Sequence, residues 1–332
     1  MFHNTTILIT WWTGTWWQAI VQSLLEKYQI KKVIVLSRSE DRQVQMERIM
    51  HSSKIQFVLW DIRNWELLKK VLHWVDYVIH LAALKHISKC QENPEEAISI
   101  NVQGTQNLID AAIFNKVKKV LYVSTDKAVD PYNLYGNTKA IWEQLCIHAN
   151  VNQKETIFSV LRAGNVLWSN GSVVQVLFHQ IMNHRPLTIT NPNTRRFYIT
   201  INEIIDLIYF SFCTSIGWEI FIHRWRVISL KDLTECMIGL YWRWNEEILQ
   251  IGMRNWEKQD EILISRNESS DILFLNDSYF LLDILGRHTW NFPKVDMSEW
   301  FWTYENHTPM TEQSRKVLEW NLVHLLEWKY EW

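Results

Sequence analysis

A doubly wound α/β fold, with a parallel sheet covered by helices on both faces and a smaller α/β region after it, is predicted by two features of the sequence. Short runs of β-branched and other apolar residues alternate with segments of helical length over the first half of the chain. Such runs are typical of strands buried on both faces, and their alternation with helices implies right-handed crossovers. After Arg162 the alternation gives way to mixed short segments, which indicates a separate second region.

Six strands and four helices are expected in the first region. The strands are expected at Thr5–Thr10, Lys31–Ser37, Ile55–Leu59, Asp76–Ala82, Val117–Ser124 and Thr156–Arg162. The helices are expected at Thr15–Lys27, Glu40–His51, Pro94–Asn115 and Asn133–Ala149. Later elements are expected near Ser172–Asn183 and Asn202–Ser215, both helical, and at the strand Glu219–Ile222. No linker separates the regions, so the second is expected to pack on the carboxyl edge of the sheet, where open α/β sheets bind ligands.

Charge and cysteine content exclude several kinds of partner. The 34 Lys+Arg and 36 Asp+Glu give a formal net charge of −2, and no basic stripe is present, so nucleic acid is not expected. The four cysteines lie far apart without a CxxC pair, which predicts reduced thiols and no metal site. The most apolar later stretch, from Ile204, is short and carries Asp206, so neither a signal peptide nor a membrane span is expected. A cytoplasmic protein with a small-molecule ligand is therefore predicted.

The turn after the first strand has the position of a dinucleotide phosphate site. A helix N-terminus there offers free N–H groups to a pyrophosphate, and three glycines normally allow the tight turn and the close approach. In this sequence the three places are Trp11, Gly14 and Trp17, and the remaining members of the turn are Thr13, Thr15 and Trp16. Residues 1–165 are therefore predicted to form a dinucleotide-binding Rossmann domain, to which part of 185–225 returns, and residues 166–332 to form mainly a substrate-binding region.

Tryptophan stands where glycine is expected at further turns. The chain has 20 Trp and only 9 Gly, although glycine usually makes up about 7% of a globular protein. Tryptophans also occupy five other expected turns, at Trp60, Trp74, Trp168, Trp218 and Trp256. Glycine adopts positive φ at such places without steric cost, whereas an indole gains nothing there. Our hypothesis is that many of these letters are glycines encoded by UGA, which some bacteria translate as glycine. Trp16 is tolerable as an aromatic residue.

Tyr135 and Lys139 are the first candidate catalytic pair. Four residues apart on an expected helix, they share one face, and a strand ending in Ser124 and Thr125 lies just upstream. Together with five other segments, the stretch around them resembles the inverting UDP-N-acetylglucosamine 4,6-dehydratases of the extended short-chain dehydrogenase/reductase superfamily, which include polysaccharide biosynthesis proteins. The six segments are Ser124–Ala140, His80–Asn107, Arg162–Val174, Arg195–Thr200, Gly217–Phe221 and Ile251–Glu261, and the likeness spans residues 3–285.

The resemblance implies a set of catalytic roles. Tyr135, aided by Lys139, takes the proton of the sugar 4-hydroxyl; Lys127 as a neutral amine removes the C5 proton; and protonated Asp126 assists the departing 6-hydroxyl. Retaining dehydratases carry Glu where this chain has Lys127, after the shared Thr125 and Asp126. A strand-end ion pair between Asp126 and Lys127 is the structural alternative. Within enzymes the runner-up activity is a UDP-hexose 4-epimerase, and from another class a catalytically silent nucleotide-sensing or scaffold protein, which genuine turn tryptophans would favour.

Ligand preferences follow from the strand ends and from the resemblance. The second strand ends in Ser37 and Arg38 rather than in an acid, which favours NADP over NAD, with a solvated arginine as the alternative. Asp61 and Ile62 are expected near the adenine. The resemblance places Ala82, Ala83 and Leu84 beside the nicotinamide and implies a homo-oligomer, a hexamer in similar enzymes. The predicted UDP-sugar residues are Lys85, Asn165, Arg196, Arg254 and Glu257, although the sequence departs from the family pattern at Asn255, Trp256, Gln259 and Asp260.

Overall fold

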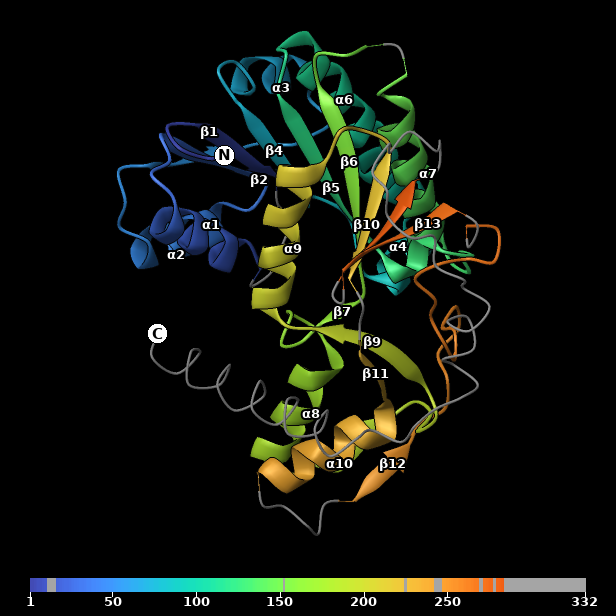
Figure 1. Cartoon of the computed structure of the whole chain (residues 1–332). Helices are drawn as coiled ribbons and strands as arrows, with labels where there is room; N and C mark the ends of the chain where they lie inside the picture. The colour runs from blue at the N-terminus through green and yellow to red at the C-terminus, as the bar shows by residue number, and fades with distance from the viewer. Residues whose placement is uncertain are drawn as a thin grey trace.

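The computed structural model describes residues 1–10, 16–151, 153–223, 226–241, 247–268, 271–276 and 279–283. Figure 1 shows a large sheet flanked by helices, with a smaller lobe beneath one edge of it. The doubly wound α/β fold predicted from the sequence is confirmed. The six expected strands of the first region lie within a few residues of their expected bounds, whereas the helices Trp65–Val71 and Ile87–Glu92 were not expected.

Nine described strands form the main sheet in the order β13-β14-β10-β6-β5-β4-β1-β2-β3. Their bounds are β1 (Thr6–Thr10), β2 (Lys32–Ser37), β3 (Ile55–Leu59), β4 (Tyr77–His80), β5 (Lys119–Thr125), β6 (Ile157–Ala163), β10 (Glu219–His223), β13 (Ile272–Asn276) and β14 (Tyr279–Asp283). The pairs from β3 through β6 to β10 are parallel, whereas β14 runs antiparallel to both β10 and β13. Strand order reverses beside β1, which places the ends of β1 and β4 at a topological switch point.

Helices cover both faces of this sheet. Their bounds are α1 (Trp16–Lys27), α2 (Glu40–Ile49), α3 (Trp65–Val71), α4 (Ile87–Glu92), α5 (Pro94–Ile98), α6 (Gly104–Phe114), α7 (Leu134–His148) and α9 (Ile201–Thr214). One apolar core joins α1, α2 and α9 to the sheet, and a second joins α3, α6 and α7 to the opposite face. The single helix expected over 94–115 is divided, because the π-helical turn Ser99–Gln103 separates α5 from α6.

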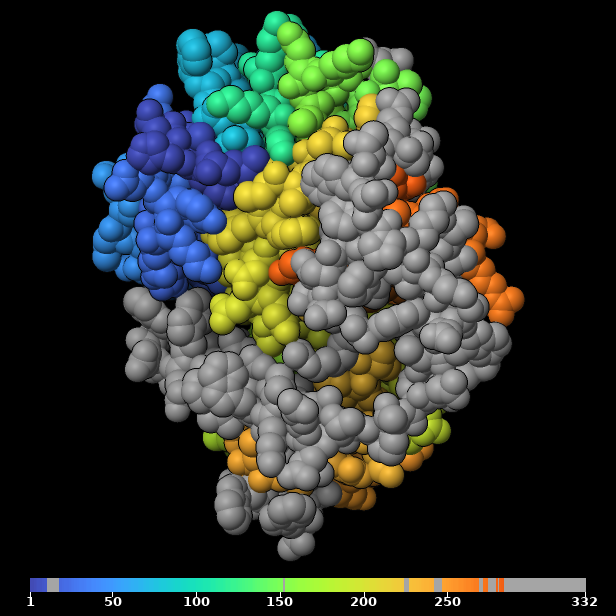
Figure 2. All heavy atoms as spheres, in the orientation of Figure 1, coloured from blue at the N-terminus to red at the C-terminus, as the bar shows by residue number. Residues whose placement is uncertain are grey.

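The smaller lobe has its own core. It contains β7 (Asn165–Val166), α8 (Val173–Met182), β8 (Leu187–Ile189), β9 (Arg195–Ile199), β11 (Arg226–Ser229), α10 (Leu230–Leu240) and β12 (Ile248–Gln250). Its strands form two small sheets, β11-β9-β7 and β12-β8. Helix α9 begins at a capping box formed by Thr200 and Glu203 directly after β9, and so connects the lobe to the main sheet. Figure 2 shows α9 on the surface beside the first helices.

Four tryptophans of the described chain adopt left-handed backbone conformations. They are Trp74 (φ 71°), Trp168 (φ 60°), Trp218 (φ 73°) and Trp256 (φ 69°). A left-handed conformation costs a residue with a Cβ atom roughly 1–2 kcal/mol, and glycine avoids that cost. All four were expected at glycine-type turns, whereas Trp60, also expected in a turn, does not have positive φ. The backbone at these four positions therefore has the conformation that glycine favours.

Candidate active site

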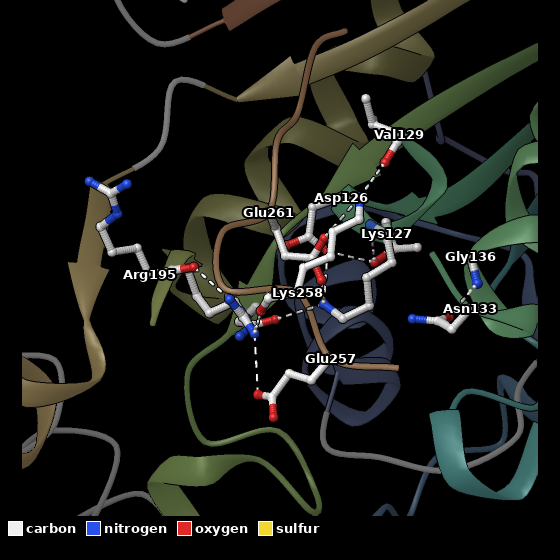
Figure 3. Close-up of polar contacts among 12 residues, drawn as sticks. Asp126, Lys127, Val129, Asn133, Gly136, Arg195, Glu257, Lys258 and Glu261 are labelled. Atoms are coloured by element: carbon white, nitrogen blue, oxygen red, sulfur yellow. Dashed lines mark hydrogen bonds and ion pairs between the residues drawn. The ribbon is translucent and has the colours of Figure 1, made fainter. Parts of the chain in front are cut away.

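The carboxyl end of β5 brings Thr125, Asp126 and Lys127 together. Asp126 begins a short 3-10 turn and is fully buried, while the Thr125 hydroxyl donates a hydrogen bond to its Oδ1 atom at 2.9 Å. The Lys127 ammonium lies 3.0 Å from the same oxygen. The second oxygen, Oδ2, is buried and makes no hydrogen bond within the described chain. A buried carboxyl group thus has one oxygen with two polar contacts and one oxygen with no hydrogen bond among the described residues. Figure 3 shows Asp126 beside Lys127 and Glu261.

Helix α7 presents Tyr135 and Lys139 next to this turn. Asn133 caps the helix by accepting a hydrogen bond from the Gly136 amide at 2.9 Å. A Cβ atom on Gly136 would lie 2.2 Å from the Lys127 carbonyl oxygen, so only glycine permits helix and turn to approach this closely. Lys139 is buried and donates to the Val123 carbonyl at 2.8 Å, with its Nζ atom also over the ring of Trp142. Local spacing and close packing together position the predicted pair.

Burial shifts the pKa values of Tyr135 and Lys139, the two predicted catalytic side chains of α7. Burial raises the pKa of Tyr135, the Asp126 carboxylate raises it further, and a hydrogen bond with Thr125 opposes both effects. Burial also lowers the pKa of Lys139 well below its ordinary value, although Glu143 opposes this. The lowering of the Tyr135 pKa by Lys139 and a nicotinamide ring remains a prediction for the cofactor-bound protein.

The segment 254–261 closes the site from the smaller lobe. The Asn133 side-chain amide donates to the Trp256 carbonyl at 3.2 Å, and the Lys258 ammonium donates to the Val129 carbonyl at 3.0 Å. Glu261 extends toward the cluster, with Oε1 3.8 Å from the Lys127 ammonium (Figure 3). The segment 254–261 is therefore in direct contact with the turn after β5 and with the cap of α7.

The five predicted substrate residues are only partly brought together. Arg196 on β9 donates to the carbonyls of Gln259 and Lys258, each at 2.8 Å, and its guanidinium lies 3.3 Å from the Glu257 carboxylate. Three further residues complete the predicted set. Asn165 Oδ1 lies 3.5 Å from the Lys127 ammonium, the Lys85 ammonium donates to the Asn170 carbonyl at 3.1 Å, and Arg254 is exposed. Arg196 and Glu257 thus order the 254–261 segment in this structure.

An ion-pair network occupies the ends of β2 and β3. The Arg38 guanidinium, predicted to meet a 2′-phosphate, lies 3.0 Å from Asp61 and 3.4 Å from Glu96. Arg63 pairs with the same two carboxylates, at 2.7 Å and 2.8 Å. Burial alone would raise the pKa of Asp61, but hydrogen bonds from Arg63 and Arg38 lower it to about 2. Asp61 therefore holds both arginines at the sheet edge.

The predicted cofactor residues that follow β2, β3 and β4 lie at this edge of the sheet. A small cavity there is lined by Leu36, Arg38, Trp60, Asp61, Ile62, Ala82 and Ile100. Ala82 and Ala83 are small and buried, and the Asn101 side chain holds the amide and carbonyl of Leu84 at 2.7 and 3.0 Å. Ser37 is buried against Gln43. Of the predicted phosphate turn, Trp11, Thr13, Gly14 and Thr15 lie outside the described residues, and Trp16 and Trp17 are the first two residues of α1.

Sequence reasoning missed several residues of the site. Arg63, Asn101, Lys258 and Glu261 contact predicted site residues or their backbone, and Asn133 caps the helix that carries Tyr135 and Lys139. Lys258 and Glu261 lie in Ile251–Glu261, one of the six segments that carry the resemblance. Their charged side chains, close to the predicted residue Glu257, were a signal that could have identified them as site residues. Asn101 lies inside an expected helix, where a polar residue at a buried position points to a specific hydrogen bond.

Comparison with known proteins identifies the family. The sequence profile of the polysaccharide biosynthesis protein family matches residues 7–282. The chain belongs to this family. A protein of Methanocaldococcus jannaschii called an uncharacterized membrane protein is 40% identical, over 84% of this chain and 86% of its own. A protein of Rickettsia rickettsii called UDP-glucose 4-epimerase is 37% identical, over 86% and 85%. Among the described helices, none has the length and apolar character required to cross a bilayer.

Two solved structures share the fold. The structure of Pen from Bacillus thuringiensis is 37% identical, has a TM-score of 0.81 and covers 85% of this chain and 90% of its own. The dTDP-glucose 4,6-dehydratase DesIV of Streptomyces venezuelae, solved with NAD and TYD bound, has a TM-score of 0.72 at 19% identity, over 91% and 98%. At that identity the likeness supports the fold alone. This chain is an enzyme of the nucleotide-sugar epimerase and dehydratase superfamily.

Proposed function

We propose that this enzyme is a C5-inverting UDP-N-acetylglucosamine 4,6-dehydratase. The observation that carries the proposal is the buried cluster of Thr125, Asp126 and Lys127 facing Tyr135. A lysine directly after the buried aspartate would supply a base, and Asp126, whose buried Oδ2 atom makes no hydrogen bond among the described residues, would supply an acid. Both groups that elimination of water needs would then be present. A 4-epimerase would need only Tyr135 and a cofactor, and Lys127 would then have no role in the reaction.

Each residue has one step in the proposed course. Tyr135 accepts the proton of the substrate 4-hydroxyl, and the resulting 4-ketone acidifies the hydrogen on C5. Lys127 as an amine then removes that proton, while Asp126 donates its own to the 6-hydroxyl, which leaves as water. A bound nicotinamide would supply a reversible hydride acceptor, by which the hydride from C4 would be returned at C6, so the overall conversion involves no net oxidation. Reprotonation of C5 from the opposite face gives the inverted 2-acetamido-2,6-dideoxy-4-ulose.

The proposed substrate-binding residues, cellular location, oligomeric state and pathway rest on the resemblance to the dehydratases. Lys85, Asn165, Arg196, Arg254 and Glu257 are proposed to bind the UDP-sugar, with the arginines pairing with its diphosphate. A cytoplasmic homo-oligomer, a hexamer in similar enzymes, would pass the product to surface polysaccharide or pseudaminic acid synthesis. The division into a dinucleotide-binding domain at 1–165 and a mainly substrate-binding region at 166–332 belongs to the same proposal.

Product analysis tests the proposed activity directly. Incubation with UDP-N-acetylglucosamine and NADP is expected to give a nucleotide sugar lighter by one water, detected by mass spectrometry. A product of unchanged mass that differs only at C4 would establish the epimerase, which the names of the Rickettsia relatives favour. No turnover with either UDP-N-acetylglucosamine or UDP-glucose would support the silent protein.

Preference for NADP over NAD is proposed from Arg38 at the end of β2. Its guanidinium lies beside the carboxylates of Asp61 and Glu96. A bound 2′-phosphate would take the place of these carboxylates and form a charge-assisted hydrogen bond with the guanidinium. Replacing Arg38 by alanine is expected to weaken NADP binding about 10- to 100-fold, the equivalent of about 1.5–3 kcal/mol, and to leave NAD binding within about twofold. Titration calorimetry with both cofactors measures this. Arg48→Ala, an exposed arginine on α2, is the matched control. Equal losses for NAD and NADP would contradict the preference.

A further inference from the structure

Glu261 places a second buried carboxylate against Lys127. Its side chain is 3% exposed, and its Oε1 atom lies 3.8 Å from the Lys127 ammonium. On the other side, Asp126 Oδ1 lies 3.0 Å from the same ammonium. The two carboxylates come from parts of the chain far apart in sequence, the turn after β5 and the 254–261 segment (Figure 3). Lys127 is thus held between them.

The charges that face Glu261 come from three elements. Asp126 and Lys127 belong to the turn after β5, Arg196 to β9, and Lys258 to the same segment, with its ammonium 3.8 Å from Glu261 Oε2. Burial raises the pKa of Glu261, and Asp126 raises it further, whereas Lys127, Arg196 and Lys258 oppose this. Because little water reaches these groups, charges at such distances interact more strongly than on the surface.

We propose that Glu261 is a positioning residue for Lys127: its carboxylate holds the lysine ammonium in the site and sets the pH at which Lys127 becomes an amine. The inference rests on the proposed role of Lys127 as the base that removes the C5 proton. A neighbouring negative charge favours the protonated lysine, so it makes the amine a stronger base and stabilises the ammonium formed when the C5 proton is taken.

Asp260 provides a matched control one residue away. Its carboxylate accepts two hydrogen bonds of 2.8 Å from the Arg195 guanidinium, and among the described residues it forms no hydrogen bond or ion pair with Lys127 or Asp126. Asp260→Asn and Glu261→Gln remove the same charge from the same segment. Only Glu261→Gln is expected to change the titration of Lys127.

Titration of Lys127 followed by NMR of ¹³C-labelled lysine tests the inference without requiring turnover. The resonance is assigned by its absence in Lys127→Arg. In Glu261→Gln the midpoint is expected to move toward lower pH, because a neighbouring negative charge is removed, and in Asp260→Asn it is expected to stay at the wild-type value. Coincident midpoints for wild type and Glu261→Gln would overturn the proposal. If that variant does not fold, Glu261→Asp, which retracts the carboxylate by one methylene, is expected to give a smaller shift in the same direction.

Kinetics then connect the titration to the reaction. In Glu261→Gln the rising limb of the kcat profile is expected to move to lower pH with the titration midpoint, kcat on the plateau to fall, and KM to stay within about twofold, since a less basic amine removes protons more slowly. An unmoved limb beside normal turnover would also overturn the inference. If wild type gives no dehydrated product but the midpoint still moves, the proposed function fails while the coupling of Glu261 to Lys127 stands.

Discussion

Replacing Lys127 by glutamine is expected to lower dehydration of UDP-N-acetylglucosamine by about 10²–10⁴-fold, the usual contribution of a general base. Glutamine keeps most of the side chain's length and polarity but cannot accept the C5 proton. Tyr135 lies on a different element, helix α7, so oxidation of the 4-hydroxyl should continue in the variant. The defect is therefore expected at elimination rather than at substrate binding.

Isotope exchange separates these two steps. In deuterated water, wild type should incorporate deuterium at C5 of the product, whereas Lys127→Gln should accumulate reduced cofactor with little exchange at C5. Lys89→Gln, an exposed lysine on α4 that pairs with Glu92, serves as the control and should match wild type. Exchange at the wild-type rate in the Lys127 variant would remove this residue from the role of base and favour the strand-end ion pair.

The first half of the fold was predictable because its signals are local. The apolar run of β1 and the spacing of Tyr135 and Lys139 on α7 depend only on residues near one another in the chain. The π turn at Ser99–Gln103 was not predictable, since tertiary packing rather than local preference produces such turns. The short strands of the smaller lobe were also largely missed, because two to five residues carry little periodic pattern.

The site divides in the same way. Asp126 and Lys127 were predicted because the stretch at the end of a strand resembles a family motif, which the sequence itself displays. Glu261 and Arg63 were missed because they form ion pairs with residues distant in sequence, Lys127 and Glu96. A charged residue in a loop has no local signal for the partner it will meet. Such contacts require the three-dimensional structure.

The turn between β1 and α1 carries the other large expected effect. Replacing Trp11 and Trp17 together by glycine is expected to raise NADP affinity by at least about 30-fold, because removing two indoles from a turn that must lie against the cofactor diphosphate would relieve about 1–3 kcal/mol at each position. β1 ends at Thr10 and α1 begins at Trp16, so the intervening turn is as short as a dinucleotide phosphate loop requires. Titration calorimetry with NADP measures the change.

Trp74 supplies the control for this prediction. It is 79% exposed with a φ of 71°, and it precedes β4, at the sheet edge opposite the phosphate turn. Trp74→Gly is therefore expected to leave NADP affinity unchanged and to raise the free energy of unfolding by about 1 kcal/mol through relief of the left-handed backbone. Trp60→Gly, at a position without positive φ, should give no such gain.

The effects of the glycine variants on NADP affinity and on stability, together with the masses of natural peptides, decide whether the natural protein contains these tryptophans. If UGA encodes glycine in the source organism, peptides of the natural protein will have glycine masses at positions 11, 17, 74, 168, 218 and 256, and the glycine variants will bind NADP more tightly and resist unfolding better. Tryptophan masses at those positions, or UGG codons in the gene, would show that the tryptophans are genuine. Combined with unchanged NADP affinity in the variant of Trp11 and Trp17, that result would favour a protein that senses or scaffolds rather than catalyses.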